Sequence, residues 1–211
     1  MELPIHQKSD EVNRAQNHIA WLQEKYPNVE SYKVDLTETF ETLKKALPQI
    51  ENEEVVRYMA YVNTRSRLRG VTLYALANEK NGIVVGTGNK VEDYGIGFFT
   101  KYGDGAVDVS PIGELLKSEV RALARHLGVI PEISEAVPTD GLHSTGATDE
   151  DQIGATYDEL EWAMQEYDEG KREGNFAGRA AEVMKIYTKR HEANAHKISM
   201  PPVFQFLIPG K

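Results

Sequence analysis

The chain has 211 residues, a formal net charge of −9 at pH 7 and no cysteine. The length suits one domain, and the negative charge argues against general binding of nucleic acids. Without cysteine, disulfides, thiolate chemistry and cysteine zinc sites are excluded. No apolar run approaches membrane-spanning length and the N-terminus lacks a secretory pattern, so we expect a cytoplasmic protein with no membrane or nucleic-acid partner.

Apolar residues spaced three and four apart predict helices, and the expected ranges are 9–26, 37–47, 53–78, 117–127, 157–167 and 176–191. Thr148 precedes three acidic residues and is expected to cap one more. Strands are expected at 29–34 and 82–85, whereas 1–5 looks like the tail of a strand with no preceding element to pair with. Helices alternating with short apolar strands indicate one α/β domain over residues 1–211.

The loop that follows Ile83–Val85 is the most informative segment. The apolar run is typical of a buried strand of a parallel sheet. Residues 86–105 then gather glycines, threonines, lysines and acidic residues into a short stretch. This composition suits a site where backbone and side chains close on a highly charged ligand.

Several residues near this loop allow two interpretations each. Glu92 and Asp93 either stabilise a helix start or bind magnesium. Lys117 begins a helix, where a lysine indicates a nearby anion unless it is simply exposed. Thr139 either belongs to a surface turn or binds a phosphate.

The arginines at 65, 67 and 69 alternate within a predicted helix. Residues two apart on a helix do not share a face, so a solvated basic surface is the usual interpretation. The alternative is that one arginine turns inward and binds a carboxylate or phosphate. The sequence has no zinc-ligand pattern, no nucleophile elbow and no Walker-A motif.

Taken together, these segments resemble ammonia-dependent NAD synthetase from Leu3 to about Lys197. The most specific piece is Phe98-Phe99-Thr100-Lys101-Tyr102-Gly103-Asp104-Gly105. Leu3-Pro4, the alternating arginines, Pro138-Thr139 and the acidic helix after Thr148 follow in the family's order and spacing.

The resemblance implies a parallel sheet flanked by helices, of the adenine-nucleotide α-hydrolase (ATP pyrophosphatase) type, in a homodimer. It implies that the nicotinate carboxylate of deamido-NAD attacks the α-phosphate of ATP, so that pyrophosphate leaves and an acyl-adenylate forms. Ammonia then attacks the activated carbonyl and gives NAD and AMP. No covalent enzyme intermediate is needed, and no residue is expected to act as a catalytic nucleophile.

The resemblance also assigns binding roles by position. Residues expected to contact ATP are Thr87, Lys117 and Thr139, and Glu92 is expected to hold Mg²⁺. Residues expected to bind deamido-NAD are Arg67 (as the inward member of the alternating arginines), Lys101, Asp108, His196 and Lys197.

Two departures from the family pattern stand out. Gly88-Asn89 occupies positions where the family often has Asp-His. The family's Ser-Gly-Gly-x-Asp-Ser pyrophosphate loop, expected upstream of Leu3, is absent from the sequence. We therefore expect an N-terminally truncated synthetase, lacking the first strand and its loop, with little or no activity by itself.

Two other classes of function stay open. One is a different amide ligase of the ATP-pyrophosphatase type, such as a GMP synthetase or a tRNA-modifying relative. The other is a non-catalytic nucleotide-binding or dimerisation module. Residues 143–146 are a candidate mobile lid.

Overall fold

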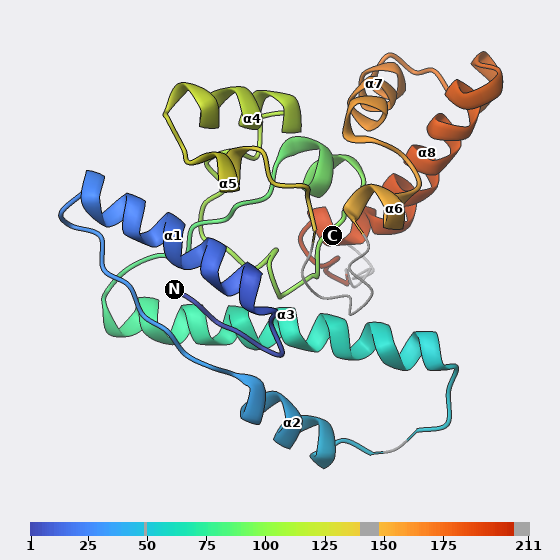
Figure 1. Cartoon of the computed structure of the whole chain (residues 1–211). Helices are drawn as coiled ribbons and strands as arrows, with labels where there is room; N and C mark the ends of the chain where they lie inside the picture. The colour runs from blue at the N-terminus through green and yellow to red at the C-terminus, as the bar shows by residue number, and fades with distance from the viewer. Residues whose placement is uncertain (49, 140–147, 205–211) are drawn as a thin grey trace, which may run out of the picture.

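The computed structural model describes residues 1–48, 50–139 and 148–204. The candidate lid at 143–146 lies outside these residues. Helices account for most of the described chain (Figure 1), and their bounds are α1 (Ser9–Lys25), α2 (Thr37–Ala46), α3 (Glu54–Glu79), the π-helical turn η1 (Lys90–Gly95), α4 (Lys117–His126), α5 (Pro131–Ser134), α6 (Asp149–Ile153), α7 (Tyr157–Asp168), the 3-10 turn η2 (Glu173–Asn175) and α8 (Gly178–Ile198).

Each helix predicted from the periodicity is present, within one or two residues at most ends. The exception is α8, which continues seven residues beyond His191 and therefore contains His196 and Lys197. The short elements η1 and α5 were not predicted, since each is too short to show a repeating apolar pattern. Thr148 caps α6 as expected, accepting a hydrogen bond from the Asp151 amide.

The predicted strands form only in part. Among the described residues, strand pairing is limited to two isolated parallel bridges, Glu2–Lys33 and Val85–Val109. Glu2 pairs with Lys33 of a later segment, which does not conflict with the expectation that the first residues have no preceding element to pair with. The extended parallel sheet stays a prediction.

Two apolar clusters hold the helices together. The larger one joins η1, α7 and α8 and includes the fully buried side chains of Tyr157, Leu160, Met184 and Tyr187. The smaller one joins the N-terminal segment to α2 and α3 through Ile5, Leu36 and Phe40. In Figure 1, α3 runs the length of one side of the molecule, with α1 and α2 on either side of it in this view.

No helix in the described part of the chain is both long and apolar enough to cross a membrane.

Candidate functional site

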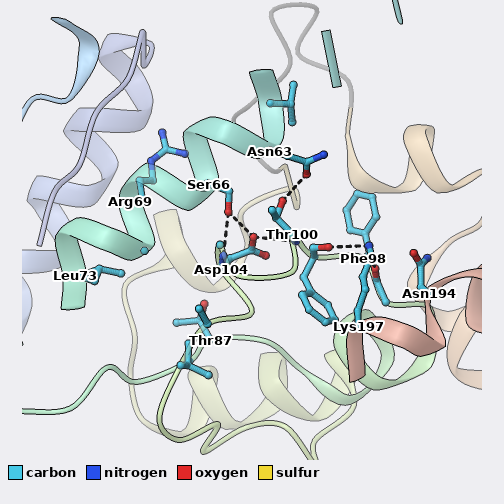
Figure 2. Close-up of a pocket in the computed structure, with 18 of the residues that line it drawn as sticks. Asn63, Ser66, Arg69, Leu73, Thr87, Phe98, Thr100, Asp104, Asn194 and Lys197 are labelled. Carbon is cyan, nitrogen blue, oxygen red and sulfur yellow. Dashed lines mark hydrogen bonds between the residues drawn. The ribbon is translucent and has the colours of Figure 1, made fainter. Parts of the chain in front are cut away.

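A cavity of about 680 Å³ lies between α3, residues 84–87, the loop 97–107 and α8. Figure 2 shows Asn63, Ser66 and Arg69 of α3 along one side of it, Thr87 on another, and Asn194 and Lys197 at the far end. The cavity thus brings together segments that are more than 100 residues apart in the sequence. Its lining combines apolar and charged side chains, as is common in small-molecule sites.

The loop from Thr100 to Asp104, part of the most specific piece of the sequence, is clamped against α3. Ser66 Oγ donates to Asp104 Oδ1 at 2.6 Å, and the Asp104 amide donates back to Ser66 Oγ at 2.9 Å. Thr100 Oγ1 donates to Asn63 Oδ1 at 2.7 Å. Gly103 allows this close approach, because a Cβ there would lie 2.2 Å from Ser66 Oγ. Asp104 is therefore held at the cavity wall in a fixed orientation.

Lys197 closes the far end of the cavity. Its Nζ donates to the carbonyl oxygens of Gly97 and Phe99, each at 2.8 Å. Burial lowers the pKa of the Lys197 ammonium, with the nearby Asp104 opposing that shift. The predicted deamido-NAD residue Lys197 is thus in the cavity, where two backbone carbonyls fix its position.

The predicted deamido-NAD residues Arg67, Lys101 and His196 lie next to one another but are not among the residues that line the cavity. Lys101 Nζ donates to the His196 carbonyl, and Arg67 Nε donates to the Lys101 carbonyl at 3.2 Å. These contacts join Arg67, Lys101 and His196 into one chain of neighbours, although His196 contributes its backbone and not its ring.

The expectation that Arg67 is the inward member of the alternating arginines is wrong. Arg67 is exposed, whereas Arg69 lines the cavity. Arg69 Nε donates to the Leu3 carbonyl, and its terminal nitrogen donates to Gln7 Oε1, both at 3.0 Å. Because burial withdraws the guanidinium from water, the pKa of Arg69 is lowered. The way α3 packs against its neighbouring elements fixes the rotation of the helix about its axis, and this rotation turns Arg69 inward and leaves Arg67 exposed.

Asp108 has a clear structural contact in addition to its predicted role. Its Oδ2 accepts from the Val84 amide at 2.7 Å, and its Oδ1 accepts from the Tyr74 hydroxyl at 3.2 Å. The carboxylate therefore stabilises the segment that carries Thr87. Thr87 itself follows that segment and lines the cavity.

A second polar cluster forms around Glu92 on η1. Asn89 begins this turn, and its side chain accepts from the Val91 and Glu92 amides. Glu92 Oε1 accepts from Lys117 Nζ at 2.7 Å and from the Tyr157 hydroxyl at 2.5 Å. Both charged partners are largely buried, with side-chain exposures of 15% for Glu92 and 21% for Lys117. The Glu92 carboxylate is thus an anion in direct contact with Lys117 at the start of α4.

Tyr157 is the residue of this cluster to which the sequence assigned no role. Its ring is buried beside Lys117, whose Nζ lies 4.9 Å from the ring centroid. Its hydroxyl also lies 3.1 Å from Asp149 Oδ2. Burial, with the charges of Glu92 and Asp149, raises the Tyr157 pKa, so the hydroxyl keeps its proton. In the sequence, Tyr157 stands at an apolar position of a predicted helix, and this position does not indicate that its hydroxyl bonds to Glu92.

Asp93 follows Glu92 and lies against the Thr87 loop, since a Cβ on Gly88 would fall within 1.8 Å of Asp93 Oδ2. Burial raises the pKa of Asp93 to about 7, and the charges of Glu92 and Asp104 add to this. The loop, Asp93 and the Glu92 cluster are thus contiguous. Thr139 is exposed and lines neither this cavity nor the smaller one near α4, so the structure does not bring it into direct contact with the cluster.

The Glu92 cluster fits a magnesium site of the kind that substrate phosphates complete. Glu92 Oε2 has no hydrogen bond to any described residue, so one carboxylate oxygen is available. Within the described residues no group of three or more histidine, aspartate and glutamate side chains could hold a metal ion by itself. Mg²⁺ commonly binds through one or two carboxylates together with phosphate oxygens.

The family model and the similar proteins indicate the same family. Residues 1–201 match the family model for NAD synthase. The chain is 37% identical over 175 residues to the NH(3)-dependent NAD(+) synthetase of Methanococcoides burtonii, which covers 81% of this chain and 64% of that protein. It is 38% identical over 179 residues to the enzyme of the same name from Alkaliphilus oremlandii, covering 82% and 67% respectively. The chain thus spans about two thirds of the length of these relatives.

Solved structures give the same result for the fold. The NMN synthetase of Francisella tularensis superposes with a TM-score of 0.76 at 31% identity, over 97% of this chain and 77% of that one. The NH3-dependent NAD synthetase of Campylobacter jejuni superposes with a TM-score of 0.70 at 24% identity, over 96% and 76%. The described helices therefore have the arrangement found in this group of proteins, and the chain belongs to the NAD synthase family.

Proposed function

We propose that this chain is the larger part of an ammonia-dependent NAD synthetase, which uses ATP to convert deamido-NAD into NAD through an acyl-adenylate. One observation carries the proposal: in a chain of this family, Thr87 lines the cavity, the next residue Gly88 lies against the Asp93 carboxyl, and the adjacent Glu92 pairs with Lys117, although neither Glu92 nor Lys117 lines the cavity itself. Cationic, hydroxyl and carboxylate groups in neighbouring segments are the kinds of group that bind a nucleoside triphosphate with Mg²⁺, which supports the proposal.

The proposed ATP-binding side lies around Glu92. Lys117 supplies a point charge for the phosphates, and the Thr87 and Thr139 hydroxyls donate hydrogen bonds to phosphate oxygens. The free Oε2 of Glu92 holds Mg²⁺, which when bound neutralises charge that builds up on the phosphates. The Tyr157 hydroxyl and Lys117 keep the Glu92 carboxylate in one orientation.

The proposed deamido-NAD side lies toward α8. Lys197 lines the cavity there, and Arg67, Lys101 and His196 form a hydrogen-bonded chain of neighbours. Asp108 accepts from the Val84 amide in the segment that leads to Thr87. Binding two nucleotides in one cavity holds the nicotinate carboxylate near the α-phosphate, so that the reaction proceeds as an intramolecular one.

A homodimer is part of the proposal. The N-terminal half of α3 exposes Val55, Val56 and Met59, which are 61%, 47% and 40% accessible. Neighbouring exposed apolar side chains of this kind are typical of protein–protein contacts. Sedimentation of the chain with and without Val56→Glu tests this point, and a monomer in both cases contradicts it.

A second candidate has a specific observation in its favour. The Francisella tularensis neighbour, with the higher TM-score of the two superposed structures, is named as an NMN synthetase. The same chemistry on the mononucleotide would need the ATP side of the cavity but fewer contacts on the α8 side. Comparing deamido-NAD with nicotinate mononucleotide as substrates distinguishes the two.

The test uses two proteins: the 211-residue chain, and a completed chain in which the part of the Methanococcoides burtonii enzyme outside the match is fused to it. Both are incubated with ATP, ammonia, Mg²⁺ and each nucleotide, and release of pyrophosphate and formation of NAD are measured. We expect conversion of deamido-NAD by the completed chain and little or none by the 211 residues alone.

Matched variants of the completed chain test the site. Glu92→Gln is expected to lower the rate by about 100-fold or more. Glu114→Gln is the control, because the Glu114 side chain is 94% exposed. Robust NAD formation by the 211-residue chain contradicts its predicted inactivity. A completed chain that folds, by circular dichroism, and releases no pyrophosphate with either nucleotide contradicts the proposed function.

A further inference from the structure

Side chains of α8 bind the backbone of residues 95–98 (the linking segment), which leads out of η1. His191 Nδ1 donates to the Gly95 carbonyl at 2.6 Å, and Asn194 Nδ2 donates to the Ile96 carbonyl at 2.9 Å. Because a carbonyl oxygen can only accept, Nδ1 is a ring nitrogen of His191 that carries a proton. The two side chains are three residues apart, so they lie on one face of α8 and cap two consecutive carbonyls at the end of η1.

These two carbonyls need partners from outside η1. The last carbonyls of a helix have no partner in a following turn, and a buried carbonyl that stays unpaired costs free energy. Ile96 is fully buried, and within the described residues the hydrogen bonds to the Gly95 and Ile96 carbonyls come from α8. A π-helical turn is a rare geometry that is often found at functional sites, and here the contacts from α8 complete its hydrogen bonding.

The linking segment also holds the backbone of Glu92. The Ile96 amide donates to the Val91 carbonyl at 3.0 Å, and the Phe98 amide donates to the Glu92 carbonyl at 2.7 Å. On the other side of the residue, the Glu92 amide donates to Asn89 Oδ1 at 3.1 Å. The linking segment is therefore bonded to α8 through carbonyls and to η1 through amides, so a displacement of this segment moves the backbone of Glu92.

Close packing fixes α8 against the linking segment. In Figure 2, Asn194 lies beside the segment that carries Phe98. Gly97 has φ +61°, and a Cβ there would lie 2.4 Å from Asn194 Cβ, so a side chain at this position would push α8 away. The His191 ring stacks on the buried Tyr187 with an interplanar angle of 11°. His191 is thus held by packing as well as by its hydrogen bond, as a residue that orients a neighbouring group must be.

We propose that His191 and Asn194 are positioning residues for Glu92. By capping the linking segment they hold η1 in the geometry that directs the Glu92 carboxylate to Lys117, 2.7 Å away. Substitution of outer residues that orient a metal-binding group typically costs about 10- to 100-fold in metal affinity or activity. The effect on the use of Mg²⁺ rests on the proposed function, whereas the effect on the backbone of Glu92 does not.

The first experiment measures amide hydrogen exchange in the 211-residue chain and needs no enzymatic activity. His191→Phe keeps an aromatic ring in place and removes the Nδ1 donor. We expect exchange at the Ile96 and Phe98 amides to accelerate at least about tenfold, because their bonds to η1 then open more often. The Gly86 amide, which is bonded outside this region, should change by less than about threefold.

His191→Asn is the matched conservative variant. Asparagine carries a nitrogen donor the same number of bonds from Cα as Nδ1 of histidine, but it lacks the ring. Exchange at Phe98 in this variant should stay within about threefold of the original chain. If ring packing were the whole role of this residue, His191→Asn would be the more damaging of the two changes. Asn194→Leu, which is similar in size and has no donor, gives the same exchange test should His191→Phe fail to fold.

The second experiment uses the completed chain and measures the Mg²⁺ concentration that gives half-maximal release of pyrophosphate. His191→Phe should raise this concentration about tenfold and His191→Asn by less than about threefold, with a smaller effect on the rate at saturating Mg²⁺. If the unsubstituted completed chain releases no pyrophosphate, the proposed function fails, and the exchange measurement decides this inference by itself.

Three results would overturn the proposal. One is exchange at Phe98 that His191→Phe leaves unchanged. Another is the reverse order of the two variants, with the larger effect in His191→Asn. The third is an unchanged Mg²⁺ requirement in His191→Phe although exchange is faster, which would mean that the Glu92 carboxylate keeps its position without the cap.

Discussion

Tyr157→Phe tests how the Glu92 cluster is built. The substitution removes only the hydroxyl, which lies 2.5 Å from Glu92 Oε1 and 3.1 Å from Asp149 Oδ2. The ring is 1% exposed and keeps its volume as phenylalanine, so no cavity is created. What is lost is a hydrogen bond to a charged group, worth about 1.5–3 kcal/mol.

The expected loss lies near the middle of that range, because Glu92 keeps its bond to Lys117 at 2.7 Å. A loss of about 2 kcal/mol in a chain of this size lowers the melting temperature by roughly 4–8 °C. Urea unfolding followed by circular dichroism gives the free energy of unfolding directly. Tyr26→Phe is the matched control, since the hydroxyl of this 43% exposed tyrosine bonds to no described residue.

A double-mutant cycle assigns the effect to the contact. Combining Tyr157→Phe with Glu92→Gln should give a coupling free energy of about 0.5–3 kcal/mol, as expected for groups in direct contact. If Tyr157→Phe is as stable as the original chain within about 0.5 kcal/mol, or if the two changes are additive, the hydroxyl does not orient Glu92 and the reasoning fails.

The remaining predictions concern two glycines with positive φ and one ion pair between α7 and α8. Gly97→Ala should destabilise by more than about 2 kcal/mol, because Gly97 has φ +61° and a Cβ there would lie 2.4 Å from Asn194 Cβ. Gly128→Ala, at φ +69° with nothing within 4 Å, should cost only about 1 kcal/mol, and equal losses by urea unfolding would contradict the argument from packing. The hydrogen bonds from Arg179 lower the pKa of Glu159 to about 2 from 4.5, so the stability this pair contributes is present above pH 4.5 and lost as the pH falls toward 2. In Arg179→Gln the Glu159 carboxyl, followed by NMR, should titrate closer to 4.5, and an unchanged midpoint would exclude Arg179 as the cause.

The helices could be read from the sequence because their information is local. Apolar spacing, a threonine cap at 148 and a glycine at 128 with positive φ each act within a few residues. The strands could not be read in the same way. The run 82–85 has strand composition, yet only Val85 forms a bridge, because pairing requires a partner edge that composition does not supply.

The candidate site shows the same division. The sequence indicated Glu92, Lys117, Thr87 and Lys197, and the structure brings the first two into direct contact and places the other two in the cavity. It also indicated Arg67 as the inward arginine, which is wrong, since packing turns Arg69 inward instead. Residues two apart on a helix differ in direction by a large angle, and only the neighbouring elements decide which one is buried.

The sequence by itself determined the family, the order of the helices and the residue types that serve a charged ligand, because these depend on identity and spacing along the chain. The tertiary structure decided that Tyr157 reaches Glu92 across 65 positions and that α3, residues 84–87 and α8 line one cavity. Such contacts join groups far apart in the chain, and the free energy that selects them comes from burial and pairing in the whole fold, which no local pattern records.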